Sequence, residues 1–247
     1  MRTLKLTIAY DGTNYVGWQR QTNGLSVQQA IEDAVAPLVD DSERRPGVAG
    51  ASRTDAGVHA AAQVASVNLD VDLSTSSLLR AINVRLPVDI RILQVEDAAP
   101  GFHARFHSRG KSYRYRLARS VVMSPFDRAY AWHVPDVSDI AAMRRAASAF
   151  VGRHDFASFQ ARGSSTLDTV RTIGRLDIDE RGDEVVVEIE GDGFLRHMVR
   201  AIVGTLVEVG SGLRADDTVP AILAERHRRA GGPTAPARGL MLIAVRY

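Results

Sequence analysis

Two hydrophobic periodicities alternate along this chain of 247 residues, and their order limits the folds that it can adopt. Apolar residues at every second position predict half-buried strands, whereas apolar residues three and four positions apart predict helices. Leu4, Leu6, Ile8 and Tyr10 show the first pattern. From there the predicted order is strand, helix, strand, strand, helix, strand, which is typical of ferredoxin-like domains.

A similar order of elements recurs in the second part of the chain, so we expect two α/β halves, 1–105 and 106–247. Ser26 followed by Gln29 predicts a helix start with a capping box. Residues 152–168 show neither periodicity and are expected to form an irregular insertion. The predicted strands are 4–10, 48–51, 64–69, 90–95, 113–117, 129–134, 170–178, 185–189 and 240–245, and the main helices follow Ser26 or cover 78–82, 140–150 and 195–209.

The composition is that of an ordinary globular protein, with 45% hydrophobic and 24% charged residues. The sequence contains no run of about 18 apolar residues, so no membrane span is expected. It enters a strand pattern at Leu4, so we expect no signal peptide. Cysteine is absent. We therefore expect no disulfide and no thiol nucleophile, and a cytoplasmic location.

Positive charge is concentrated in residues 101–126, although the net charge of the chain is only +2. This segment contains no Asp or Glu. Cations that neutralise phosphates, interleaved with aromatic rings that stack on bases, are typical of single-stranded nucleic-acid binding. A solvated basic strand with core aromatics is an equal alternative. The cations are Arg105, Arg109, Lys111, Arg114, Arg116 and Arg119, and the aromatics among them are Phe106, Tyr113 and Tyr115.

The run from Arg53 to His59, RTDAGVH, places a single carboxylate, Asp55, between a cation and an imidazole. It is too polar for a core strand and is interrupted by Gly57, so it predicts a loop. Catalytic groups are often carried by loops that rigid elements hold in place. The alternative is that Asp55 caps a turn and that Arg53 is a solvated charge.

Seven segments in this order resemble the tRNA pseudouridine synthases of the TruA family. The resemblance extends over almost the full chain. One departure is Ser52, where the family most often has Gly before the Arg. The segments are IAYDGTNYVGWQRQ (8–21), SVQ (26–28), RTDAGVH (53–59), FHARF (102–106), YRY (113–115), FLRHMVR (194–200) and GLML (239–242).

The resemblance implies two ferredoxin-like or RRM-like halves that share a mainly antiparallel sheet, with the active-site cleft between them. It implies an isomerase that converts uridine to pseudouridine at nucleotides 38, 39 and 40 in the anticodon stem and loop of tRNA. No metal, cofactor or energy source is needed, because the product is an isomer. A homodimer is implied, with tRNA as partner and no membrane or further protein partner.

The resemblance also implies roles for single residues. Asp55 acts as nucleophile at the sugar C1′ or as a base at C2′, and the sequence leaves both open. Its cationic partner is Arg200 or Arg53, with Arg200 preferred. Arg196 and Arg200 are expected to share a helix face. Tyr113 stacks on the flipped base.

The remaining assignments concern the substrate pocket and the RNA backbone. Leu240 and Leu242 are expected to wall the pocket, although on periodicity alone they are core residues. His59 is expected to be a loop hydrogen-bond partner rather than a general base. The candidates for phosphate contacts are Lys5, Arg20, Arg105 and Arg109.

Two other functional classes remain open on the residues alone. A non-catalytic tRNA-binding protein would have the basic segment and the tyrosines, but it would not need Asp55 with a paired arginine. A nucleoside glycosidase would release free uracil and usually needs a second carboxylate or a metal. Asp11 is the candidate for that carboxylate, although it lies in an Asp-Gly turn.

Overall fold

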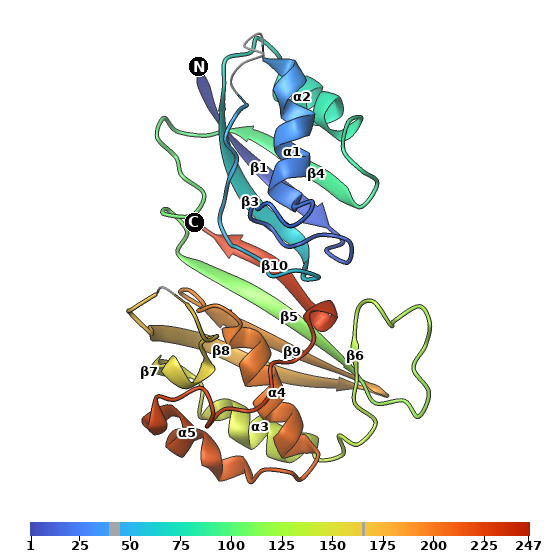
Figure 1. The fold of residues 1–247 in the computed structure, drawn as a ribbon, viewed down its shortest axis with the longest axis vertical. Coiled ribbons are helices and arrows are strands. Elements are labelled where there is room, and N and C mark those ends of the chain that lie inside the picture. The colour runs from blue at the N-terminus through green and yellow to red at the C-terminus, as the bar shows by residue number, and fades with distance from the viewer. Residues whose placement is uncertain (40–44, 165) are drawn as a thin grey trace. The chain divides into compact units, whose positions relative to one another are not determined.

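The structure, a computed structural model, describes residues 1–39, 45–164 and 166–247. The chain forms two compact units. Unit 1 comprises Met1–Arg109 together with Leu242–Tyr247, and unit 2 comprises Gly110–Met241. Each unit combines helices with a mainly antiparallel sheet, which confirms the predicted fold class (Figure 1). It remains a prediction that the half 1–105 contributes the catalytic acid and the half 106–247 contributes the stacking tyrosine and the partner arginine. The active-site cleft also remains a prediction.

The sheet of unit 1 is built around its first strand, β1, which pairs antiparallel with both β3 and β4. Leu4, Leu6 and Ile8 on β1 are fully buried, as their period of two predicts. The strand order is β4-β1-β3-β10, and β2 pairs with Ala65 and Ser66 of β3. The bounds are β1 Arg2–Tyr10, β2 Ala49–Gly50, β3 His59–Leu69, β4 Ile90–Asp97 and β10 Leu240–Arg246.

Two helices of unit 1 begin at serine caps. Helix α1, Val27–Val35, starts where the Ser26 side chain accepts a hydrogen bond from the Gln29 backbone N–H, as the sequence predicts. Helix α2, Thr75–Asn83, is capped in the same way by Ser74. α2 packs on β4 and contacts α1. A short 3₁₀ helix, Ala36–Leu38, follows α1.

The sheet of unit 2 has the order β5-β9-β8-β7, in which β9 pairs antiparallel with β5 and β8. Tyr113 and Tyr115 on β5 face Ile189 and Val187 of β9, and both tyrosines are buried. The strand predicted over 129–134 is present only near residue 132, where it pairs with β5 in parallel orientation. The bounds are β5 Gly110–Ala118, β6 Trp132–His133, β7 Gly152–Asp155, β8 Val170–Arg181 and β9 Glu184–Gly191.

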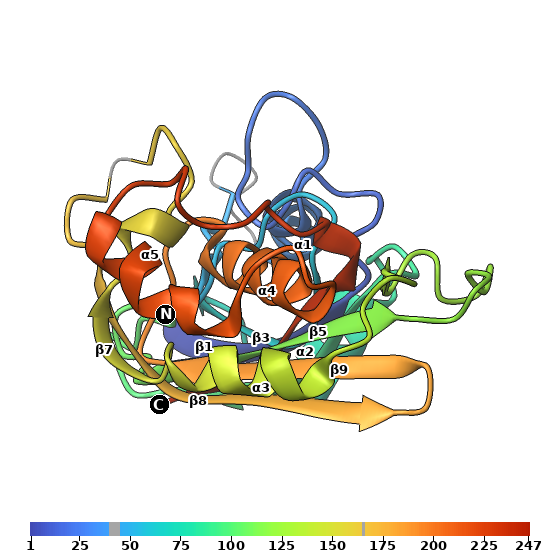
Figure 2. The same ribbon diagram turned by 90° about the horizontal axis from the view of Figure 1, so that it is seen from below.

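The helices of unit 2 are grouped on its sheet, with α3 in contact with α4 and β8 (Figure 2). Helix α4 is buried over most of its length. At Gly204 a Cβ atom would lie only 1.8 Å from the Pro233 carbonyl oxygen, so glycine is required there. None of the helices in the described ranges is long and apolar enough to cross a membrane. The helices are α3 Ile140–Ser148, α4 Met198–Gly210 and α5 Val219–Glu225, with 3₁₀ turns at Ala157–Phe159, Asp216–Thr218 and Ala237–Gly239.

Two predictions about unit 2 are wrong. The helix expected over 195–209 begins at Met198, because His197 adopts a left-handed backbone conformation with φ of 62°. Arg196 therefore lies outside the helix and does not share a helix face with Arg200. The expected irregular insertion contains strand β7, which pairs with β8. β7 has the sequence GRHD, which carries no hydrophobic alternation that would reveal a strand.

Candidate active site

The loop that carries Asp55 lies between β2 and β3 in unit 1. Asp55 is half-buried, with the buried side chains of Thr54 and Val58 on either side along the loop. The Val58 N–H donates to the Asp55 carbonyl at 3.1 Å, and Gly57 has φ of 77°, so the chain turns tightly just after the carboxylate. The loop therefore leaves the Asp55 side chain partly exposed on a tightly turned backbone.

The segment after β1 supports this loop from both sides of Asp55. The Trp18 N–H donates to the Thr54 carbonyl at 3.0 Å, and the Gly57 N–H donates to the Tyr15 carbonyl at 3.3 Å. The Tyr10 hydroxyl lies 2.8 Å from Thr54 Oγ1, in a buried hydrogen bond. The backbone around Asp55 is therefore attached to the first strand and its loop.

Two glycines of the first loop make this close approach possible. A Cβ at Gly17 would lie 2.6 Å from the Thr54 carbonyl oxygen, and the φ of Gly17 is +104°. A Cβ at Gly12 would lie 2.0 Å from the Val58 carbonyl oxygen. Real Cβ atoms do not approach backbone this closely, so both positions require glycine. Hydrophobic periodicity does not predict this support, and Gly12 and Gly17 are the signal for it in the sequence.

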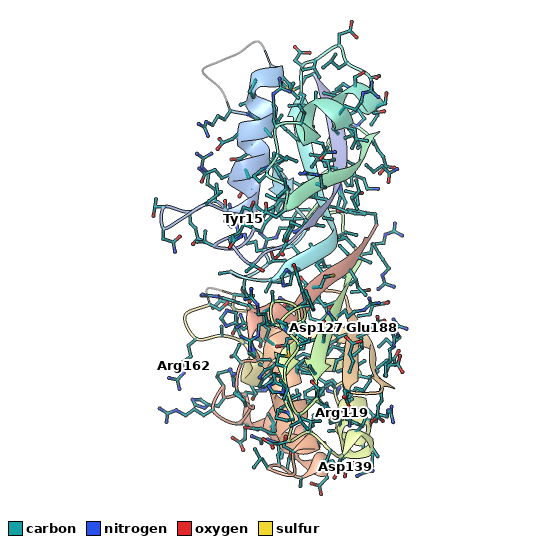
Figure 3. All side chains as sticks on the ribbon, turned by 90° about the vertical axis from the view of Figure 1, so that its right-hand side faces the viewer. Tyr15, Arg119, Asp127, Asp139, Arg162 and Glu188 are labelled. Atoms are coloured by element: carbon teal, nitrogen blue, oxygen red, sulfur yellow. The ribbon has the colours of Figure 1, made fainter. Side chains whose placement is uncertain are left out.

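His59 is only 2% exposed and ties the start of β3 to the first loop. Its Nδ1 accepts a hydrogen bond from the Gly12 N–H at 3.1 Å and lies 3.1 Å from Asp11 Oδ1. That carboxylate also accepts from the Thr13 N–H and hydroxyl. Nearby, the Tyr15 hydroxyl donates to Asp89, and burial, with that carboxylate, raises the pKa of Tyr15 (Figure 3). Contact of His59 with substrate stays a prediction.

The cations of unit 1 differ in what they contact. Arg53 is exposed and forms no ion pair with Asp55 or with any other residue in the described ranges. Lys5 and Arg20 pair with Glu96 and Glu32, at 3.1 and 3.0 Å. Arg105 is exposed, with its guanidinium 5.9 Å from the centroid of the Phe106 ring, and Arg109 is exposed as well.

Arg200 lies in the first turn of α4 in unit 2 and is half-buried. Its Nε donates to the Ala235 carbonyl at 2.7 Å, and the Ala235 N–H donates back to the Arg200 carbonyl at 3.0 Å. This pair of bonds fixes the guanidinium relative to the segment before β10. The neighbouring Tyr115 hydroxyl donates to the Pro236 carbonyl at 2.7 Å. Burial raises the pKa of Tyr115, and the charges of Arg200 and Arg238 partly oppose that rise.

Tyr113 lies on β5 with its side chain 6% exposed. Its ring meets the Phe194 ring edge to face, with centroids 5.3 Å apart and an interplanar angle of 89°. Gly239 packs on the next tyrosine, since a Cβ there would lie 2.5 Å from the Tyr115 ring. The resembling segments 113–115 and 194–200 lie within unit 2, together with the first three residues of the segment 239–242.

The two leucines expected to wall the pocket belong to different units. Leu240 is 5% exposed in unit 2, and Leu242 is fully buried in unit 1. A role in the pocket stays a prediction for both. Among the described residues, no group of three or more His, Asp or Glu side chains could hold a metal ion.

Comparison with known proteins identifies similar chains. A family model described as tRNA pseudouridine synthase matches residues 6–107 and 146–247. A protein of Syntrophotalea carbinolica named tRNA pseudouridine synthase A is 46% identical over 100% of this chain and 97% of its own length. One of Geobacter sulfurreducens with the same name is 42% identical over 100% of both chains. A chain in a solved Cbf5-Nop10-Gar1 complex aligns over 97% of this chain and 48% of its own, with 12% identity and a TM-score of 0.41.

Proposed function

Since the chain belongs to the tRNA pseudouridine synthase family, we propose that it isomerises uridines at nucleotides 38, 39 and 40 of tRNA, with Asp55 as its catalytic carboxylate. The observation that carries this proposal is the support of the Asp55 loop. Hydrogen bonds and two glycine contacts hold the backbone on both sides of a half-buried acid. A turn that merely caps itself needs no such support from a second loop.

The reaction breaks the bond between uridine N1 and ribose C1′ and forms a bond between C5 and C1′. The proton on C5 is lost and N1 gains one, so the atoms balance without a cofactor. A carboxylate can attack C1′ or remove a proton from C2′, and both routes require Asp55 to be ionised. Because a partly buried carboxylate is costly to ionise alone, a nearby cation favours the reactive form.

Arg200 is our candidate for that cation. Its guanidinium is fixed by Ala235 before any substrate binds, and one of five N–H donors makes that bond. A pre-oriented cation stabilises charge without reorganising during the reaction. Arg53 is exposed and forms no ion pair with Asp55, which favours Arg200 as the partner.

Tyr113 is proposed to stack on the flipped uracil, since an enzyme that acts at C1′ of a base-paired or stacked nucleotide has to extrude it first. Three adjacent target nucleotides suit recognition of RNA by shape and backbone rather than by base sequence. We propose that the protein acts in the cytoplasm, as a homodimer.

The test compares the wild type with Asp55→Asn on an unmodified tRNA transcript. Pseudouridines are mapped as carbodiimide-resistant adducts, and tRNA affinity is measured in parallel. We expect modification at nucleotides 38–40 by the wild type. The variant should form pseudouridine at least about 10⁴-fold more slowly, the scale of loss for an essential catalytic group, while its Kd for tRNA stays within about threefold.

Two results would contradict the proposal. Loss of tRNA binding in Asp55→Asn, with full activity of the bound fraction, would indicate a binding role for the carboxylate. Release of free uracil by the wild type would indicate a glycosidase. Asp72→Asn, at an exposed aspartate in the loop between β3 and α2, is the matched single-charge control and should retain wild-type rate and affinity.

A further inference from the structure

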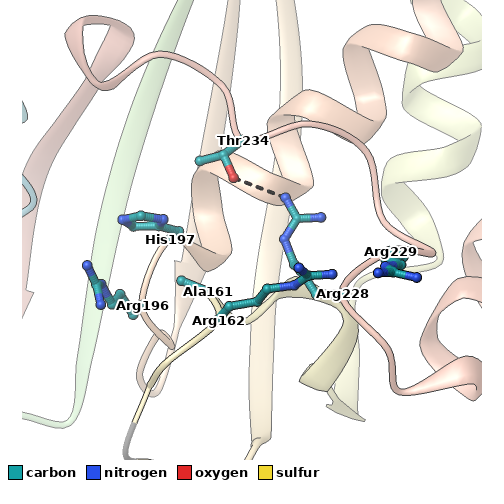
Figure 4. A pocket seen from close by; sticks show the side chains of 7 residues that line it. All are labelled: Ala161, Arg162, Arg196, His197, Arg228, Arg229 and Thr234. Atoms are coloured by element: carbon teal, nitrogen blue, oxygen red, sulfur yellow. Dashed lines mark hydrogen bonds between the residues drawn. The ribbon is translucent and has the colours of Figure 1, made fainter.

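Unit 2 contains a pocket of about 380 Å³ beside the start of α4. Its polar lining comes from three separate segments, which follow the turn at Ala157–Phe159, precede α4 and follow α5 (Figure 4). The lining consists of Ala161, Arg162, Arg196, His197, Arg228, Arg229 and Thr234.

The lining of this arginine pocket carries four guanidinium groups and no carboxylate. None of the four forms an ion pair within the part of the chain that the structure describes, whereas other arginines of unit 2, such as Arg114 and Arg116, pair with acids. Like charges gathered in a recess raise the free energy of the unliganded protein. In a chain with a net charge of only +2, this arrangement indicates that an anion neutralises the pocket.

The pKa of the Arg228 guanidinium is affected by burial and by two neighbouring charges. Burial lowers the pKa of Arg228, the charge of Arg162 lowers it further, and Glu208 partly opposes both. The side chain is nevertheless fixed, because Nη1 donates to the Gly231 and Gly232 carbonyls at 3.2 and 2.8 Å and Nη2 donates to Thr234 Oγ1 at 3.0 Å. A cation held in place in this way is pre-organised for a ligand.

The other cations extend from the rim of the pocket. Arg162 and Arg196 are exposed, and their segments are joined where the Ala161 N–H donates to the Arg196 carbonyl at 2.9 Å. Arg162 points away from the ribbon of unit 2 (Figure 3). Arg229 is exposed on the side of the pocket opposite Arg196, and Arg162 and Arg228 lie between them in this view (Figure 4). The positive end of the α4 dipole lies beside them.

We propose that the arginine pocket binds phosphate groups of the RNA backbone, an inference that rests on the tRNA substrate of the proposed function. Guanidinium groups match phosphate oxygens in a bidentate manner. The lining has no Phe, Tyr or Trp ring for stacking on a base and no amide that would read a base edge. The contact is therefore independent of base sequence, which is the property required of a binding site for RNA backbone.

Occupation of the pocket also bears on Arg200. Thr234 lines the pocket, and the next residue, Ala235, holds Arg200 through the two hydrogen bonds between them. A phosphate that engages Arg228 stabilises the segment on which Arg200 depends. The pocket is thus a positioning site as well as a source of affinity.

The test neutralises two exposed arginines of the lining that come from separate segments, in the double variant Arg162→Gln/Arg229→Gln. The Kd for tRNA is measured from 50 to 300 mM KCl. We expect the Kd at 100 mM to rise about tenfold and the slope of log Kd against log[KCl] to fall by roughly 1.5, as for two lost phosphate contacts. The rate at saturating tRNA should change by less than the affinity does.

The matched control is Arg145→Gln/Arg181→Gln, which removes the same two charges from α3 and from the end of β8. The control should keep the wild-type slope. If the slope of log Kd against log[KCl] fell equally in the control, the effect would be due to net charge alone, and the proposal would be overturned. Melting temperatures of all three proteins verify that the variants are folded.

A second arm separates RNA phosphate from free phosphate. The wild type is titrated calorimetrically with inorganic phosphate, and we expect no saturable binding below 1 mM. Saturable binding of phosphate that the pocket variant loses, with unchanged affinity for tRNA, would overturn the proposal. A wild type that forms no pseudouridine would instead contradict the proposed function, so the two failures are distinguishable.

Discussion

Hydrogen bonds of the neighbouring backbone hold the loop that carries Asp55. Thr54 and Gly57 on either side accept and donate the bonds that fix the loop, and Tyr10 adds a buried hydroxyl contact. Catalytic groups work only when geometry is held within a fraction of an ångström. At the scale of single residues, the question that matters most is which cation serves this acid.

Arg200 and Arg53 are distinguished by removing each guanidinium. Arg200→Ala should lower the rate of pseudouridine formation by about 10²- to 10³-fold, the usual effect of losing one stabilising donor. Added guanidinium or methylguanidinium should restore part of that rate. Arg53→Ala is the matched comparison and should lose less than about tenfold, since Arg53 is exposed and forms no ion pair with Asp55. Rates are measured at saturating tRNA. The reverse order of effects would assign the partnership to Arg53.

At the scale of elements, the contact between the first loop and the Asp55 loop is the main functional feature of unit 1. Gly17→Ala introduces a Cβ at 2.6 Å from the Thr54 carbonyl oxygen, at a φ of +104° that strains any other residue. We expect a loss of about 1–3 kcal/mol in the free energy of unfolding and a rate reduced at least tenfold. Urea denaturation and single-turnover rates measure the two effects.

The control for this substitution is Gly47→Ala in the same unit, where a Cβ meets no atom within 4 Å. It should match or slightly exceed the wild type in stability, because alanine restricts the unfolded chain. Full activity in Gly17→Ala would show that the two loops adjust independently of each other.

The sequence predicted strongly periodic elements well and weakly patterned ones poorly. The capped start of α1 at Ser26 and the alternating strand β1 were expected and are confirmed. β7 was missed because its four residues are polar and owe their pairing to β8. The start of α4 was placed too early because the apolar pattern continues through Leu195, whereas the left-handed backbone of His197 leaves no mark in composition.

The candidate site was predicted by resemblance more than by pattern. Asp55 stood out in its loop, but no periodicity identifies Arg200 or Tyr113, which were assigned by motif. The arginine pocket was visible only as scattered cations, because its members are brought together by folding from positions near 162, 196 and 228. A single sequence does not reveal contacts between residues that are distant along the chain.

At the scale of the whole molecule, the chain returns at its end to the unit in which it began. Tyr247 donates its hydroxyl to the Ala104 carbonyl at 2.8 Å, and its ring lies 5.6 Å from the ammonium of Lys5. Phe102 packs against the same ring, with centroids 5.1 Å apart. The final residues therefore contribute to the stability of unit 1.

The ionisation of Tyr247 tests this contribution. Burial raises its pKa above the ordinary value of about 10, so the folded state favours the neutral phenol. That stability is complete below pH 10 and is lost as the pH rises further, because the unfolded tyrosine ionises first. Tyr247→Phe should be about 1 kcal/mol less stable at pH 7 through its lost hydrogen bond. The difference in the free energy of unfolding between the wild type and Tyr247→Phe should narrow above pH 10. The change should be at most about 1 kcal/mol per pH unit, because partial exposure screens the charge.

Urea denaturation from pH 7 to 11 gives the free energy of unfolding for both proteins. Other buried tyrosines, such as Tyr115, titrate in both and cancel in the comparison. If the difference in the free energy of unfolding between the two proteins stays constant or widens above pH 10, folding does not stabilise the neutral form of the Tyr247 phenol.

The order of synthesis gives this closing strand a further consequence. During synthesis, residues 1–109 emerge from the ribosome long before Leu242–Tyr247, because all of Gly110–Met241 is made in between. The β3 edge that β10 finally covers is therefore open while the nascent chain grows, and an open edge invites wrong partners. Completion of the Asp55-bearing unit therefore waits for Leu242–Tyr247, so truncation before Leu242 would damage the unit whose first residues are made earliest.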